Sequence, residues 1–78
     1  MTPRQRDCFI AIIRGRQATG CSPTYDALRV TLGLRSKSGI HRLIKGLEER
    51  GHLVIVRLGY EGIDLIPVIH VQAVRAAA

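Results

Sequence analysis

Apolar residues recur at helical spacing in three stretches before Gly51. The first stretch places four of them on one arc of about 140°, at about 100° per residue; they are Cys8, Phe9, Ile12 and Ile13. A Thr2-x-x-Gln5 capping box precedes them, with Pro3 at the first helical position. We therefore expect a helix that ends near residues 18–20, where Gly20 supplies a stop.

The second stretch repeats the apolar spacing over a shorter length, with Tyr25, Leu28 and Leu32 at i, i+3 and i+7. Either Ser22 or Thr24 can cap this helix, Asp26 suits the dipole of its first turn, and Gly33 ends it. The next cap, Ser36 or Ser38, follows after a short link. Two short helices joined by a turn that contains glycine are typical of a helix-turn-helix, although many helical hairpins share the pattern.

The third stretch separates an apolar face from a charged one. Its apolar residues span an arc of about 100°; they are Ile40, Leu43, Ile44 and Leu47. The arc almost opposite carries Ser38, His41, Arg42 and Lys45. Residues 35–45 contain four basic residues and no acid, whereas Glu48 and Glu49 occupy the last turn before Gly51. We expect one face to pack on the first two helices and the other to be offered to an anion.

After Gly51 the pattern changes to two β-branched runs, Leu53–Arg57 and Gly62–Ile66. Gly59 in the intervening Leu58-Gly59-Tyr60-Glu61 and Gly62 at the start of the second run predict a β-hairpin, and Pro67 ends its second strand. Three helices followed by a two-stranded hairpin predict an α+β fold, a winged helix-turn-helix over residues 1–66 in which the hairpin is the wing.

Residues 67–78 form an apolar tail whose structure the pattern leaves open. It contains Val68, Ile69, Val71 and Val74 and a single charge, Arg75. A third strand, a short helix and a segment that pairs with a second subunit are all compatible with it. The tail is the candidate dimerisation segment.

Composition points to a polyanionic partner. The 78 residues make one small domain with 12 Lys and Arg against six Asp and Glu, a net charge of +6 and a pI near 10.4. No signal peptide or bilayer span is visible, so we expect a cytoplasmic, nucleoid-associated protein without a membrane. Cys8 and Cys21 are badly spaced for a disulfide scaffold or a metal site. We expect a buried Cys8 thiol, a loop thiol at Cys21, and no metal or cofactor.

The sequence offers no catalytic constellation, and we expect the chain not to be an enzyme. No pair of carboxylates is placed for acid–base work, no Cys–His or Ser–Lys arrangement can be argued, and no Gly-rich phosphate loop is present. Asp7, Asp26 and Asp64 are explained as helix-surface, dipole and turn-edge acids. Arg14 and Arg16 lie off or at the edge of the first apolar face, and we expect them to be solvated charges. No small-molecule ligand is evident.

The charged face of the third helix suits the major groove of double-stranded DNA, which admits one α-helix. The predicted base-reading residues are Ser38, Gly39, His41 and Arg42, of which Arg42 matches guanine O6 and N7. The predicted phosphate contacts are Thr24, Tyr25, Arg35, Ser36, Lys37, Lys45, Arg57 and Tyr60. These assignments also have structural alternatives. A basic helix face is usually only solvated. Thr24 is first a helix cap, and the Tyr25 ring also completes the apolar stripe of the second helix. Glu61 weakens the phosphate interpretation of the hairpin tip.

Four strings in one order resemble the N-terminal DNA-binding domain of the LexA repressor family. They are Thr2-Pro3-Arg4-Gln5-Arg6, Thr19-Gly20-x-Ser22-Pro23-Thr24, Leu32-Gly33-Leu34-Arg35-Ser36 and Leu47-Glu48-Glu49-Arg50-Gly51. A weaker match continues through Gly62–Leu65. The resemblance implies a third helix in the major groove and pairwise binding to a palindromic operator. Carried over by position, it implies that Ser36, Ser38, Gly39, His41 and Arg42 face the groove.

Two departures from the family change what the resemblance implies. The chain stops at Ala78, so we expect it to lack the family's Ser–Lys peptidase domain and cleavage-triggered derepression. Gly39-Ile40-His41-Arg42 is basic where the family often carries acid or amide groups, so a different operator is expected.

The function expected is that of a sequence-specific transcription regulator that binds inverted-repeat DNA sites as a homodimer, or that pairs with another DNA-bound regulator. The alternative is a protein-interaction module or antirepressor that uses the winged-helix scaffold to bind a transcription factor or RNA polymerase. Non-specific packing of RNA or DNA is a third possibility, for which one Phe and two Tyr offer little stacking surface.

Overall fold

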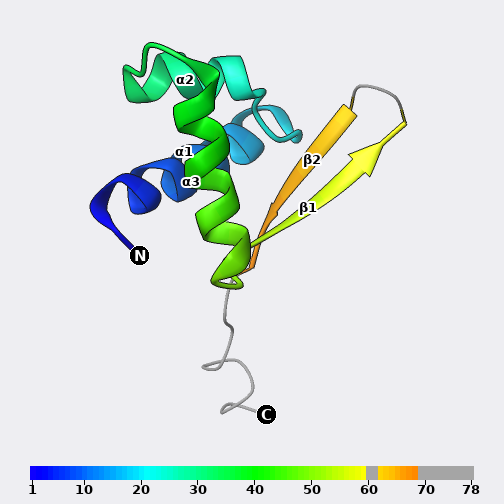
Figure 1. The fold of residues 1–78 in the computed structure, drawn as a ribbon. Helices are drawn as coiled ribbons and strands as arrows, with labels where there is room; N and C mark the ends of the chain where they lie inside the picture. The colour runs from blue at the N-terminus through cyan, green and yellow to red at the C-terminus, as the bar shows by residue number, and fades with distance from the viewer. Residues whose placement is uncertain (60–61, 69–78) are drawn as a thin grey trace.

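Three helices and one hairpin follow one another in the order that the sequence predicts. A computed structural model describes residues 1–59 and 62–68. Its elements are α1 (Pro3–Thr19), α2 (Tyr25–Leu32), α3 (Lys37–Glu49), β1 (Leu53–Leu58) and β2 (Gly62–Pro67) (Figure 1). The α+β winged-helix prediction is confirmed. The expectations for Tyr60, for Glu61 and for the tail beyond Val68 lie outside the described residues.

The helix ends form through the caps that the sequence indicates. Thr2 Oγ1 accepts from Gln5 N and Gln5 Oε1 accepts from Thr2 N, each at 3.1 Å, which completes the capping box of α1. Gly20 ends α1 with φ of 79°, in the left-handed region that favours glycine. At α2 the choice of cap is settled in favour of Thr24, whose Oγ1 accepts from Ala27 N at 3.0 Å.

The core lies where α3 crosses the other two helices and the wing. Its fully buried side chains are Cys8, Ile12, Leu28, Ile40, Ile44, Leu47, Leu53 and Leu65. Every helix and strand supplies at least one of them, and α3 supplies three. α3 packs against α1, α2 and β1, so its apolar stripe is held in place from three directions.

The wing turns one face toward the helices and one toward solvent. In the antiparallel register Ile55 lies opposite Leu65, and Leu53 opposite Pro67. Alternation along each strand puts Leu53, Ile55, Ile63 and Leu65 on the face that packs against the core. The outer face includes Val54, Leu58 and Ile66, whose side chains are exposed.

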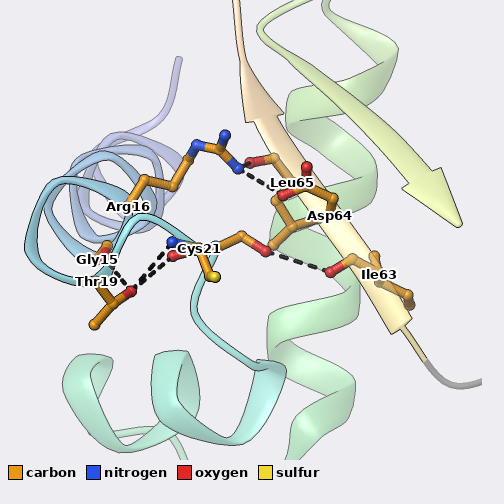
Figure 2. Close-up of polar contacts among 8 residues, drawn as sticks. Gly15, Arg16, Thr19, Cys21, Ile63, Asp64 and Leu65 are labelled. Atoms are coloured by element: carbon orange, nitrogen blue, oxygen red, sulfur yellow. Dashed lines mark hydrogen bonds and ion pairs between the residues drawn. The ribbon is translucent and has the colours of Figure 1, made fainter. Parts of the chain in front are cut away.

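Polar contacts fasten β2 to the helices in a way that the sequence analysis did not foresee. The Arg16 guanidinium lies 2.6 Å from Asp64 Oδ1 and donates to the Leu65 carbonyl at 3.2 Å (Figure 2). Ser22 Oγ donates to the Ile63 carbonyl at 3.3 Å. The expectation that Arg16 is a solvated charge and Asp64 a turn-edge acid is therefore wrong. Helical spacing describes the face of α1 but does not show that β2 will lie against its edge.

Candidate nucleic-acid interface

α3 presents a basic face to solvent because its apolar stripe is turned inward. Ile40, Ile44 and Leu47 are buried on one side of the helix. The exposed positions are Lys37, Ser38, His41, Arg42, Lys45 and Glu49, so one acid of the last turn shares this surface with the bases. The separation of the two faces follows from the 3.6-residue period and agrees with the sequence prediction.

The first turn of α3 concentrates positive potential. Ser36 is the N-cap residue, but its side chain makes no capping hydrogen bond within the described residues; its Oγ pairs with Ser38 Oγ at 2.8 Å. The first turn holds Lys37 and no acid, and the last turn holds Glu48 and Glu49 but no base. The charges of both turns oppose the helix dipole, which favours acids at the N-terminus and bases at the C-terminus. Helix stability alone would not select this distribution, whereas an anion at the N-terminus would benefit from it.

Tyr25 and His41 form an aromatic pair between α2 and α3. Their ring centroids lie 4.7 Å apart with an interplanar angle of 76°, an edge-to-face arrangement. Tyr25 also packs against the core, so its structural interpretation is confirmed. Burial raises the pKa of the Tyr25 hydroxyl, although the nearby Arg57 acts in the opposite direction. The hydroxyl therefore remains a neutral hydrogen-bond donor at physiological pH.

A cleft of about 420 Å³ separates α3 from the wing. The cleft is lined by apolar residues and by five polar or charged side chains, those of Tyr25, His41, Lys45, Glu48 and Arg57. The structure thus brings three of the predicted phosphate contacts, Tyr25, Lys45 and Arg57, into one place beside His41. Glu48 also lines the cleft, which its position in the sequence did not indicate. Its Oε1 lies 4.0 Å from Lys45 Nζ, an i,i+3 pair that offsets part of the Lys45 charge.

Apart from Tyr60, which lies outside the described residues, the other predicted site residues do not line this cleft. Arg35 and Lys37 are exposed around the start of α3, and Thr24 caps α2. A Cβ added to Gly39 would lie 3.3 Å from Leu34 Cδ1. The missing side chain of Gly39 therefore faces the turn before α3, so this glycine makes room for Leu34. Gly46 acts similarly, since a Cβ there would lie 2.5 Å from Gln5 Nε2 of α1.

The described residues offer neither a metal site nor a membrane-spanning helix. No group of three or more His, Cys, Asp or Glu side chains in residues 1–59 and 62–68 is placed to hold a metal ion. No helix in that part of the chain has the length and apolar character to cross a bilayer.

Fold and surface together define a winged helix-turn-helix protein whose third helix carries an exposed basic face. No protein-family model matches the chain. The chain is 52% identical over 54 residues to the LexA repressor of Rhodospirillum rubrum, a match that covers 68% of this chain and 22% of that protein. It is 47% identical over 53 residues to the LexA repressor of Acidiphilium cryptum, with 68% and 23% covered. The LexA repressor of Pelagibacter ubique is 45% identical over 53 residues, with 68% and 24% covered.

These similarities confirm the resemblance to the LexA repressor family: the chain carries a LexA-like winged-helix domain. The matched region is the N-terminal part of the relatives, and the chain spans about a quarter of their length.

Proposed function

We propose that the chain is a transcription regulator that binds double-stranded DNA with α3 in the major groove. The observation that carries the proposal is the exposed face of α3, which carries Lys37, Arg42 and Lys45 against one acid, Glu49 in the last turn, and is backed by a buried apolar stripe. A helix that docks in the groove needs this combination, because its rear must be anchored while its front meets a polyanion. The similarity to bacterial LexA repressors supports the same role and a cytoplasmic location.

The proposed roles divide by position on α3. Ser38, His41 and Arg42 face outward near its N-terminal half and are proposed to read base edges. Gly39 is proposed to join them as a point of close backbone approach; a Cβ there would also lie 3.3 Å from Leu34 Cδ1. The proposed phosphate contacts are Thr24, Tyr25, Arg35, Ser36, Lys37, Lys45, Arg57 and Tyr60.

The cleft between α3 and the wing gives the phosphate proposal its local geometry. Lys45 and Arg57 reach it from different elements, and Tyr25 adds a hydroxyl that is neutral at physiological pH. A phosphodiester at this position would meet two cations and one hydroxyl donor, with Glu48 as the opposing charge. Charge-assisted hydrogen bonds to phosphate are the stronger kind, so this group is expected to position the protein on the duplex without selecting sequence.

The chain is further proposed to act as a homodimer on inverted-repeat sites, or together with another DNA-bound regulator. The LexA-like fold supports pairing, because helix-turn-helix dimers recognise half-sites about one helical turn apart. The tail, residues 67–78, is the candidate dimerisation segment that the sequence indicates.

Selection of bound duplexes from a random DNA pool by the full chain tests the proposal. An enriched inverted repeat supports specific recognition by a dimer. An enriched single half-site or direct repeat retains sequence-specific binding but rejects the symmetric dimer. Failure to enrich any sequence with folded protein rejects the specific regulator and favours the alternative of a protein-interaction module.

Salt dependence separates DNA binding from a role in protein interaction. If four to six phosphates are neutralised, log K should fall against log salt with a slope of about −4 to −5. A shallow slope without DNA preference would contradict the phosphate contacts proposed around α3.

A further inference from the structure

The two edges of the wing differ in their contacts with the rest of the described chain. β2 lies nearer to α1, and β1 is the outer strand (Figure 1). The carbonyls of Ile63 and Leu65 on the β2 edge accept hydrogen bonds from Ser22 and Arg16. That edge is therefore covered by side chains of the helical part and is closed to another strand.

The antiparallel register fixes which groups β1 directs outward. Ile63 and Leu65 point their peptide groups away from β1, toward α1 and the α1–α2 loop. Their register partners are Arg57 and Ile55, so these two residues belong to the non-hydrogen-bonded pairs of the ladder. By the same alternation, Leu53 also belongs to a non-hydrogen-bonded pair, with Pro67. The N–H and C=O groups of Leu53, Ile55 and Arg57 consequently point away from β2.

Nothing in residues 1–59 and 62–68 pairs with these outward groups of β1. None of the hydrogen bonds outside the β1–β2 ladder uses the backbone of Leu53, Ile55 or Arg57. The strand is six residues long, contains no proline and reads Leu-Val-Ile-Val-Arg-Leu. Edge strands are normally shortened, interrupted by proline, charged or covered, and in the described part of the chain β1 shows only one of these protections, the charge of Arg57.

We propose that β1 pairs edge to edge with β1 of a second copy of this chain, in antiparallel register about Ile55. This register places Ile55 opposite Ile55, and Leu53 opposite Arg57, so the outward N–H and C=O groups of each copy meet those of the other. It also places Val54 opposite Val56 in the closer, non-hydrogen-bonded positions. Arg57 faces Leu53 and not a second Arg57, so no like charges lie opposite each other.

We take the partner of the β1 edge to be a second copy of the chain, because this edge is complementary to itself. A two-fold axis at Ile55 satisfies both strands with a single sequence, which is the isologous contact that cyclic dimers use. The result is a four-stranded sheet in the order β2-β1-β1-β2, with the helices of both copies on the same side. Strand addition of this kind derives its affinity from main-chain hydrogen bonds and its specificity from the alternating side chains.

Charge placed at the Val54–Val56 pair tests the register. Val54 is exposed at 48%, and its substitution leaves the buried core untouched. In Val54→Lys/Val56→Lys, the symmetry puts two lysine pairs opposite each other across the proposed contact. In Val54→Glu/Val56→Lys, the same positions form two Glu–Lys pairs. Both variants place a lysine at position 56, opposite Asp64 within the chain, so they differ only at the exposed position 54.

The measurement is sedimentation equilibrium of the full chain over a wide range of concentrations, without DNA. The wild-type chain should dimerise, and V54K/V56K should lower the association constant about 10-fold or more, since each cross-strand like-charge pair is destabilising. V54E/V56K should retain dimerisation within about threefold of wild type. A V54E/V56E variant, which lowers the overall positive charge, should also dissociate. Because its glutamate at position 56 also lies opposite Asp64 within the chain, its folding is checked first, and the outcome then separates local repulsion from net charge.

Circular dichroism of all variants checks that each remains folded. A wild-type chain that is monomeric throughout would overturn the proposal. So would equal association of V54K/V56K and V54E/V56K, which would move the contact to another surface such as the tail. Because no DNA is present, failure of the proposed DNA-binding function does not affect this result.

Discussion

The contact between Arg16 and β2 gives the sharpest test of how the wing is held. Arg16→Met keeps an apolar stem of similar length and removes the guanidinium, so packing of the stem is largely preserved. The lost interactions are the ion pair with Asp64 and the hydrogen bond to the Leu65 carbonyl. Both charged side chains are partly exposed, at 30% and 27%, so solvent screens the pair and its contribution must be discounted.

The expected loss of stability is moderate in absolute terms, but it is a large share of the stability of a domain of this size. A partly exposed ion pair contributes about 0.5–1 kcal/mol, and a hydrogen bond from a charged donor contributes about 1–1.5 kcal/mol. We expect Arg16→Met to lower the free energy of unfolding by about 1.5–2.5 kcal/mol. For a domain of this length, that corresponds to a decrease in Tm of about 8–15 °C.

Urea unfolding followed by circular dichroism measures the effect. Arg14→Met is the matched control, because Arg14 lies exposed on the same helix, and its replacement should change stability by less than about 0.5 kcal/mol. A double-mutant cycle with Asp64→Asn should give a coupling energy of about 0.5–1 kcal/mol. If Arg16→Met is no more destabilising than Arg14→Met, the apolar face of the wing alone holds it, and the polar fastening is incidental.

Three further changes test other parts of the molecule. Arg42→Ala should reduce affinity for a selected operator by about 1–3 kcal/mol and relax the preference at one base position. Lys45→Ala should weaken binding to all sequences alike and reduce the salt slope by about 1. Equal, sequence-blind losses for both variants in binding titrations would remove Arg42 from base reading. Gly33→Ala forces a side chain into φ of 68° at the end of α2 and should destabilise the fold by about 1 kcal/mol in thermal unfolding; an unchanged Tm would contradict the strain. Burial raises the pKa of the Cys8 thiol to about 11, so a thiol reagent at mildly alkaline pH should modify the exposed Cys21 quickly and Cys8 only after unfolding; equal labelling rates in folded protein would show that Cys8 is accessible.

The fold was predictable because local and tertiary preferences agree along this chain. The Thr2-x-x-Gln5 box, the glycine stops and the change from helical to alternating spacing each depend on neighbours in sequence, and the structure confirms them. The opposed faces of α3 were predictable for the same reason. A helix with a strict apolar stripe has only one way to face a core.

The missed features all depend on residues far apart in the chain. Arg16 meets Asp64 across 48 positions, and Ser22 meets Ile63 across 41, so no local spacing could indicate either contact. The cleft beside His41 likewise required the placement of the wing relative to α3, which the hairpin pattern alone does not give.

The division of α3 into two non-overlapping sets of residues has an evolutionary consequence. The buried set, Ile40, Ile44 and Leu47, contains none of the exposed positions Ser38, His41, Arg42 and Lys45. Substitutions at exposed positions away from special contacts usually change stability by less than about 0.5 kcal/mol. A lineage can therefore replace the outer face of this helix, and the ligand preference that depends on it, by single mutations that pass through folded intermediates.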